Sequence, residues 1–296
     1  MQSYNPKRLL VPTDFSQLAT AALDYAVELS EKFNASIVLL YAEPFDRVGL
    51  PLDLYVSNFP SFQNLADEKL RQFVARELPP TIPYQIVVST QNPASAIVAA
   101  AKEHDVDLIV MGTHGRRGLR RAFLGSVSEE VLKYTDRPVL TVCKTEVPLP
   151  PMEPLFSRIV CPVNGTDIAR RSVEHAASIA TAFDAALYVV NVDEDSAARH
   201  DQIRSWIGEE LYDRCVDEEA ILSGDPAEEI LRFAEQNRAD LLVIGAQHRR
   251  FVDTTVVGTT SERLIRFARC PILTVTRPVD VPRTKTRVEE VAARVV

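Results

Sequence analysis

Short apolar runs alternate with segments of helical spacing along the chain. Between the runs, apolar residues recur at intervals of three and four, as in residues 15–33. Continuous apolar strands that alternate with helices are typical of a parallel sheet covered on both faces. The pattern therefore predicts a doubly wound α/β fold with a five-stranded parallel sheet. In the first half the predicted strands lie at residues 7–14, 36–42, 84–89, 108–111 and 137–143.

Local signals place several helix starts and one uncertain segment. Ser16 is a candidate N-cap, and Asn92 followed by Pro93 predicts another helix start. Pro12 should stop the first strand, because it cannot donate a hydrogen bond to a sheet. Residues 43–61 are predicted to be a surface loop packed on its own domain, with a lid or a partner-binding segment as alternatives, and a helix should follow at 63–77.

The second half repeats the first. Arg8 has a counterpart at an offset of 150 residues and Asp107 at an offset of 133, so the first half carries a longer connection after its second strand. A repeat of this length indicates duplicated domains. We predict domains at 1–146 and 155–278, joined by a proline-rich linker at 144–154. The tail at 279–296 is predicted to be a frayed helix or disordered.

Composition narrows the class of protein. Of 296 residues, 46% are hydrophobic and 25% are charged, and no apolar run reaches the length of a membrane span. We expect a cytoplasmic protein without a membrane segment, because the N-terminus lacks a signal-like apolar stretch. A net charge of −8 argues against a general nucleic-acid binder. The cysteines, which lack metal spacing, should be buried reduced thiols: Cys143, Cys161, Cys215 and Cys270.

The strand at 108–111 leads into a glycine-punctuated segment that suits phosphate. Gly112, Gly115 and Gly125 are followed by Ser126 at the start of a predicted helix. Glycines allow close backbone approach to an anion, and the N–H groups of a helix start point toward it. The chain contains no GxxxxGK[ST], GxGxxG, HExxH or GxSxG motif, which sets aside several enzyme classes.

A basic cluster within this segment offers three interpretations. Its side chains could reach a triphosphate, remain solvated charges, or bind an acidic protein partner. The cluster comprises His114, Arg116, Arg117, Arg120 and Arg121.

The G-x2-G-x9-G-[S/T] pattern and the downstream Arg-Pro-Val-Leu-Thr-Val strand resemble the universal stress protein family, and both halves fit it. The chain is thus similar to a tandem member with an adenine nucleotide alpha hydrolase-like fold. The resemblance implies an ATP site, with Mg²⁺ as a further candidate, at the ends of the strands. By position, the nucleotide-binding residues would be Pro12, Thr13, Asp14, Ala42, Met111, Gly112, Gly115, Arg116, Gly125, Ser126, Val127 and Ser128.

The second half departs from the family pattern. His248 replaces the second glycine and Asn164 replaces the aspartate. A side chain where backbone should approach phosphate would obstruct ATP or change its pose. The candidate second site comprises Pro162, Asn164, Val192, Gly245, His248, Gly258, Thr259 and Thr260.

The resemblance implies a stress-response protein that acts as a nucleotide-dependent switch toward an unknown protein partner. No catalytic residue is assigned, and hydrolysis should be slow at most, because Asp14 would already contact the adenine or ribose. Family members pair through their edge strands, so residues 137–143 and 270–276 should pair within the chain as a pseudo-dimer, with homodimer formation a further option. The alternative is a nucleotide-free module that binds a protein or an apolar ligand.

Overall fold

The computed structural model describes most of both halves of the chain. The described residues are 4–42, 52–113, 124–143, 154–192, 196–246, 248–251, 254–257 and 259–276. Outside them lie residues 43–51, the basic cluster at 114–121, the predicted linker up to residue 153, and the predicted tail.

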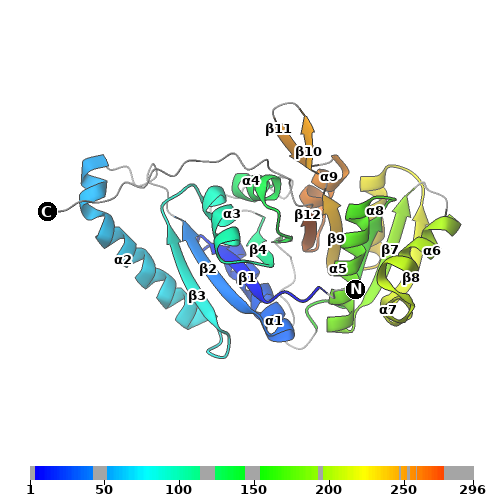
Figure 1. Ribbon diagram of the computed structural model, residues 1–296, viewed down its shortest axis with the longest axis horizontal. Helices are drawn as coiled ribbons and strands as arrows, with labels where there is room; N and C mark the ends of the chain where they lie inside the picture. Colours follow the sequence, from blue (N-terminus) through cyan, green and yellow to red (C-terminus); the bar gives the residue numbers. More distant parts are fainter. Residues whose placement is uncertain are drawn as a thin grey trace.

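The first half alternates strands and helices throughout (Figure 1). Its elements are β1 (Arg8–Thr13), α1 (Gln17–Phe33), β2 (Ser36–Ala42), α2 (Leu52–Glu77), β3 (Tyr84–Ser89), α3 (Pro93–Glu103), β4 (Leu108–Gly112), α4 (Ser126–Tyr134) and β5 (Val139–Val142).

The second half follows the same order, with extra elements. Its elements are β6 (Arg158–Val163), α5 (Asp167–Phe183), β7 (Ala186–Val192), α6 (Ser196–Ile207), α7 (Glu209–Cys215), β8 (Val216–Leu222), α8 (Pro226–Gln236), β9 (Leu241–Ala246), β10 (His248–Phe251), β11 (Thr254–Val257), α9 (Thr259–Phe267) and β12 (Ile272–Thr276).

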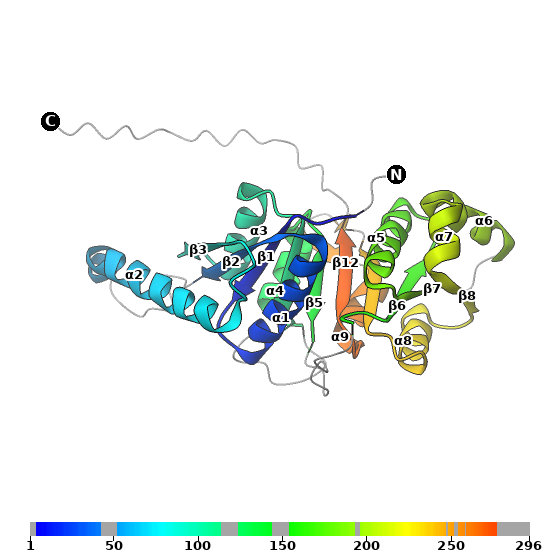
Figure 2. The same ribbon diagram turned by 90° about the horizontal axis from the view of Figure 1, so that it is seen from below.

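A single ten-stranded sheet runs through both halves in the order β3-β2-β1-β4-β5-β12-β9-β6-β7-β8. Each half contributes five parallel strands, and the halves meet where β5 pairs with β12 in antiparallel register. Figure 2 shows these two strands side by side at the centre of the molecule. This confirms the predicted fold and the predicted pairing of the two edge strands within one chain.

Helices cover both faces of the sheet. Apolar residues of α1, α2, α5, α6 and α7 pack on one face, and those of α3, α4, α8 and α9 pack on the other. The strands between them are buried along most of their length, which explains why they read as continuous apolar runs.

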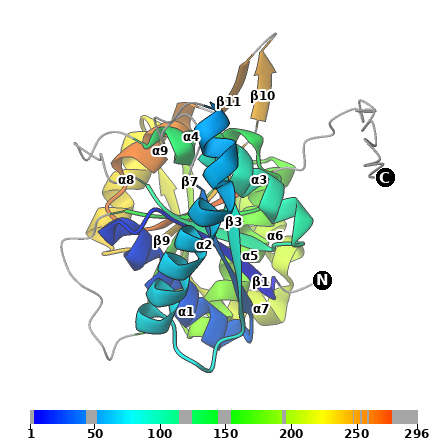
Figure 3. The same ribbon diagram turned by 90° about the vertical axis from the view of Figure 1, so that its left-hand side faces the viewer.

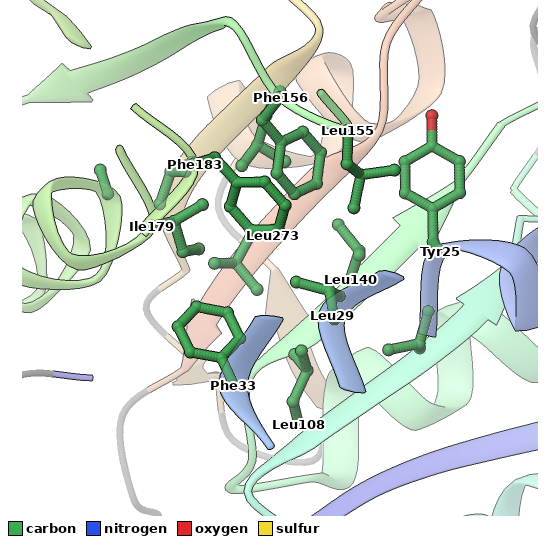
Figure 4. Packing of buried hydrophobic residues seen from close by; sticks show 14 of the residues in the cluster. Tyr25, Leu29, Phe33, Leu108, Leu140, Leu155, Phe156, Ile179, Phe183 and Leu273 are labelled. Atoms are coloured by element: carbon green, nitrogen blue, oxygen red, sulfur yellow. The ribbon is translucent and has the colours of Figure 1, made fainter. Parts of the chain in front are cut away.

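The two halves share one apolar core on the α1/α5 face. Figure 4 shows Phe33 of α1 and Phe183 of α5 pointing toward each other, with Phe156 beside them. The ring centroids of Phe156 and Phe183 lie 5.3 Å apart in an edge-to-face arrangement, and those of Phe33 and Phe183 lie 6.2 Å apart. Phe156 is fully buried in this cluster, so the two halves share one continuous apolar core.

Several predicted boundaries are confirmed. β2 and β3 span the predicted residues, and α3 begins at Pro93 with the Asn92 side chain accepting a hydrogen bond from the Ala94 N–H at 3.0 Å. Likewise, the Ser16 hydroxyl oxygen accepts from the Ala19 N–H at the start of α1. Local capping signals were sufficient for these helix starts.

Two predictions about the first half are wrong. Helix α2 begins at Leu52, so the part of the predicted surface loop that the structure describes is helical. Strand β1 continues through Pro12 to Thr13. Backbone groups of β1 face β2 and β4 alternately, since Lys7 C=O accepts from Ser36 N–H and Arg8 C=O accepts from Asp107 N–H. By this alternation the backbone of Pro12 faces β4. The last β1–β4 pair is at Leu10, so β4 requires no N–H donor from Pro12 and the strand can include it.

The second half holds an element that the sequence did not predict. Residues 248–251 and 254–257 form an antiparallel hairpin, β10–β11, where the repeat predicted a glycine loop like that of the first half. The hairpin stands above α4 in Figure 3, and β11 contacts α4 of the first half. The counterpart of the predicted phosphate loop is therefore a β-hairpin in the second half.

Candidate functional site

The carboxyl ends of β1 and β4 separate in the first half. The β1–β2 ladder runs from Arg8 to Thr13, whereas the β1–β4 ladder covers Leu9 and Leu10. Strands β2 and β3 follow β1 in sequence and lie on one side of it, and the chain then returns to place β4 on the other side. The strand order therefore reverses between β1 and β4. Doubly wound sheets bind ligands at such a switch point. The geometry places the candidate site there.

The turn from β1 into α1 forms one side of this opening. Thr13 is buried and its hydroxyl oxygen accepts from the Phe15 N–H at 3.0 Å, while one Asp14 carboxylate oxygen accepts from the Ser16 N–H at 3.0 Å. Phe15 adopts a left-handed conformation with φ of 63°. A bulky residue in this region is strained, and strained turns of this kind cluster at functional sites.

Aromatic packing holds the strained turn in place. The Phe15 ring lies 4.9 Å from that of Tyr41 at the end of β2 and 5.4 Å from that of Phe73 on α2. These contacts fix the backbone that carries Asp14, because the ring cannot leave without exposing apolar surface. The Asp14 carboxylate is therefore presented from a rigid turn.

The start of α4 forms the opposite side. The Gly125 N–H donates to Thr113 C=O at 2.8 Å, and the buried Ser128 hydroxyl lies 3.0 Å from Gly112 O and 3.3 Å from Thr113 O. These bonds fasten the first turn of α4 to the end of β4. The N–H groups of Ser126 and its two successors precede the first intrahelical hydrogen bond, so the positive end of the helix faces this edge of the sheet.

Gly112 has a packing role as well as a predicted ligand role. A Cβ at this position would lie 3.1 Å from both the Cβ and the carbonyl oxygen of Leu18 in the first turn of α1. The glycine thus lets α1 approach β4 closely. Gly245 of the second half has the same role against α5, where a Cβ would lie 2.9 Å from Ile168 Cγ1.

The second half has the same arrangement of strands at its candidate site but different side chains. The β6–β9 ladder also covers two residue pairs while β6–β7 runs from Arg158 to Val163. The Asn164 side-chain oxygen accepts from both the backbone N–H and the hydroxyl of Thr166, at 3.3 and 2.5 Å. The Ser261 hydroxyl donates to Gly245 C=O at 3.1 Å, as Ser128 does in the first half.

Comparison with known proteins identifies the class. The model of the universal stress protein family matches residues 5–142 and 155–276. The chain belongs to the universal stress protein family. Both halves match, so it is a tandem member in which two family units share one chain.

Single-domain relatives match about half of this chain. Universal stress protein MJ0531 of Methanocaldococcus jannaschii is 34% identical over 145 residues, which covers 43% of this chain and 85% of the relative. Universal stress protein Slr1230 of Synechocystis is 20% identical over 298 residues, which covers 90% of this chain and 99% of the relative. This second alignment extends over both halves of the present chain.

A solved structure has the same fold along nearly the whole chain. The crystal structure of a universal stress protein from Archaeoglobus fulgidus is similar with a TM-score of 0.75 and 24% identity, covering 94% of this chain and 100% of that one. No helix in the described part of the present universal stress protein combines the length and apolarity that a membrane crossing requires.

The structure brings most of the predicted first-domain residues to one edge. These are Pro12, Thr13, Asp14, Ala42, Met111, Gly112, Gly125, Ser126, Val127 and Ser128. Gly115 and Arg116 lie outside the described residues. The Ser128 side chain is buried against β4, so its contribution is to hold α4 in place. Met111 is buried as well, whereas Ser126 is exposed.

The predicted second-domain residues lie at the equivalent edge, except those outside the described part. Pro162, Asn164, Val192 and Gly245 end their strands there, and Thr259 and Thr260 open α9. His248 begins the hairpin strand β10, and Gly258 is outside the described residues.

The repeated aspartates, Asp107 and Asp240, are structural. Asp107 Oδ2 accepts from the backbone N–H groups of Lys7 and Arg8 at 2.7 and 3.0 Å, at the end of the sheet opposite the candidate site. Asp240 accepts from Ser157 and Arg158 in the same way. The two aspartates stand out in the sequence because they occur at equivalent positions of the two repeats. Repetition alone does not show whether a residue is structural or binds a ligand.

Proposed function

We propose that the protein binds ATP in its first domain and acts as a nucleotide-dependent regulatory switch. The observation that carries this proposal is that the Asp14 turn follows β1 and the first turn of α4 is bonded to the end of β4, so both lie at the carboxyl ends of the two strands between which the strand order reverses. The turn offers a carboxylate that can accept from a ribose hydroxyl or an adenine amino group. The helix start offers N–H donors and positive potential to the phosphates.

The same features limit the site to the first domain. In the second domain Asn164 stands at the position of Asp14, and an amide carries no charge. The second domain also carries His248, the first residue of β10, at the position of Gly115. We therefore expect one ATP molecule per chain, with Mg²⁺ accompanying the phosphates as it does in solution.

Turnover should be slow. Hydrolysis requires a base that positions water in line with the terminal phosphate. The Asp14 carboxylate is held in the turn beside β1, and in the proposed pose it contacts the nucleoside part of ATP. ATP would then act as a bound signal that stabilises one conformation of the partner-binding surface.

Calorimetric titration of Mg·ATP tests the proposal. Micromolar binding at one site per chain is expected for the wild-type protein, and Gly115→His, which copies the second-domain residue into the first, should abolish it. The matched variant His248→Gly makes the reverse change in the second domain and should leave the binding unchanged. Absence of binding at millimolar ATP would contradict the proposal and favour a nucleotide-free interaction module.

A further inference from the structure

Two cysteines occupy opposite positions at the junction of the two domains. Antiparallel strands β5 and β12 pair with Thr141 opposite Ile272 and Val139 opposite Thr274. Each step forward on β5 is a step back on β12. The ladder ends at the Thr141–Ile272 pair, and Cys270 lies in the bend just before β12. If the register is continued outward by two residues, Cys143 and Cys270 are opposite each other.

The far end of the junction shows that the register extends beyond the regular strands. By the same count, Arg137 lies opposite Thr276, and the Thr276 hydroxyl donates to Arg137 C=O at 3.3 Å. Nearer the centre, the Thr141 hydroxyl donates to Ile272 C=O at 3.2 Å. The Arg137–Thr276 pair is the counterpart of the Cys143–Cys270 pair under the approximate two-fold symmetry of the junction. At the Arg137 end the two segments therefore stay adjacent past the last ladder pair.

Opposite residues in an antiparallel pair have the separation that a disulfide needs. Their Cα atoms lie roughly 4.5–5.5 Å apart and their side chains leave the sheet on the same face. A disulfide spans Cα distances of about 4.4–6.8 Å. Cys270 lies on the face covered by α4 and α9, in one apolar cluster with Val139 and Ile272. A bond to Cys143 thus requires no large backbone movement.

The two thiols differ in access and share a low intrinsic reactivity. All four cysteines are free thiols; Cys143 is partly exposed, whereas Cys270 is buried. Burial raises the pKa of the Cys270 thiol to about 12, with the neighbouring Cys143 as the next contribution, and burial also raises the pKa of Cys143. Few thiolates exist at neutral pH, so the pair should stay reduced until an oxidant is abundant.

We propose that Cys143 and Cys270 form a reversible disulfide that links the two domains when a disulfide oxidant such as oxidised glutathione accumulates. The Cys143 thiolate attacks a sulfur of oxidised glutathione, which breaks the glutathione S–S bond and releases one glutathione thiolate. The Cys270 thiolate then attacks the Cys143 sulfur and releases the second. The two cysteines lose two electrons and two protons, and two reduced glutathione molecules carry them away.

The bond would make the domain junction covalent. The junction is held by the short β5–β12 ladder and by the shared aromatic core. A disulfide across it would keep the edges paired and cover both strands from other chains. This redox role is independent of nucleotide binding and remains testable if ATP does not bind.

Oxidation of the native, full-length protein tests the proposal. The reduced protein is incubated with oxidised glutathione at mildly alkaline pH, and its intact mass and non-reduced tryptic peptides are measured. We expect the loss of two hydrogen atoms, a cross-link between the peptides 134–144 and 270–283, and reversal by dithiothreitol. The rate should rise with pH, because thiolate is the reacting form.

Variants separate this pair from the other thiols. Cys143→Ser and Cys270→Ser should each abolish the cross-link, whereas the matched control Cys215→Ala, which removes a buried thiol distant from the junction, should retain it. Glutathione adducts on Cys143 without the cross-link would overturn the proposal, as would a cross-link that involves Cys161 or Cys215. The wild-type peptide map decides the question even if a variant fails to fold.

Discussion

The close approach of α1 to β4 makes Gly112→Ala a sensitive probe of both stability and the candidate site. The added Cβ would meet Leu18 backbone atoms, the carbonyl oxygen at 3.1 Å and the carbonyl carbon at 3.2 Å, and backbone cannot rotate away. Such overpacking costs about 1–3 kcal/mol. Alanine has less conformational freedom than glycine in the unfolded chain, which stabilises the folded protein by roughly 0.4–1 kcal/mol. The difference between these two ranges is a net loss of up to about 2.6 kcal/mol in the free energy of unfolding, centred near about 1.3 kcal/mol.

The same change should weaken ATP binding. Leu18 lies in the first turn of α1, directly after the turn that carries Asp14, so a retreat of α1 displaces that carboxylate. The control is Gly245→Ala, whose Cβ would lie 2.9 Å from Ile168 Cγ1 in the second domain. It should cost comparable stability but leave ATP affinity unchanged.

Urea unfolding followed by circular dichroism gives the stability of both variants, and calorimetry gives the ATP affinity of each. A Gly112→Ala protein as stable as the wild type would refute the close-packing argument. An equal loss of ATP affinity in both glycine variants would show that general destabilisation, rather than displacement of the Asp14 turn, weakens binding.

Three further predictions concern single side chains. Asp107→Ala removes the acceptor of two exposed backbone N–H groups, which water can then solvate, so urea unfolding should show a loss of about 1 kcal/mol. ATP affinity should be unchanged, because the residue lies at the far end of β4. Ser128→Ala removes the hydrogen bond between α4 and the end of β4, so it should lower stability by about 1 kcal/mol and also weaken ATP binding. The control Ser261→Ala removes the equivalent bond in the second domain and should lower stability without changing the ATP affinity measured by calorimetry. His175 stacks on Tyr4, and burial lowers its pKa to about 4. As the pH falls, the unfolded chain takes up this proton before the folded protein does, so stability should fall by at most about 3 kcal/mol between about pH 6.5 and 4. His175→Phe should flatten this dependence in unfolding measured as a function of pH.

The fold could be predicted from the sequence because the apolar runs and capping residues act locally and recur in both halves. Buried strands such as β2 are apolar at almost every position, and capping residues such as Asn92 fix helix starts without help from distant contacts. The pairing of β5 with β12 followed from the family's use of edge strands and is now seen directly.

What the sequence missed depends on contacts between distant segments. Helix α2 runs through Pro60, a residue that signals a break, so its first turns were assigned to a loop. The hairpin β10–β11 was missed because its residues align with a first-half segment whose glycines had predicted a loop. The packing role of Gly112 and the strained Phe15 require knowledge of which helix and which rings lie above them.

Hydrogen exchange with and without Mg·ATP tests the central claim most directly, because it locates binding as well as detecting it. The account predicts slower exchange at residues 13–16 and 125–128 of the first domain, and no change at residues 164–166 and 259–261 of the second. Protection confined to the second domain, or no protection at saturating ATP, would contradict a single nucleotide site in the first domain.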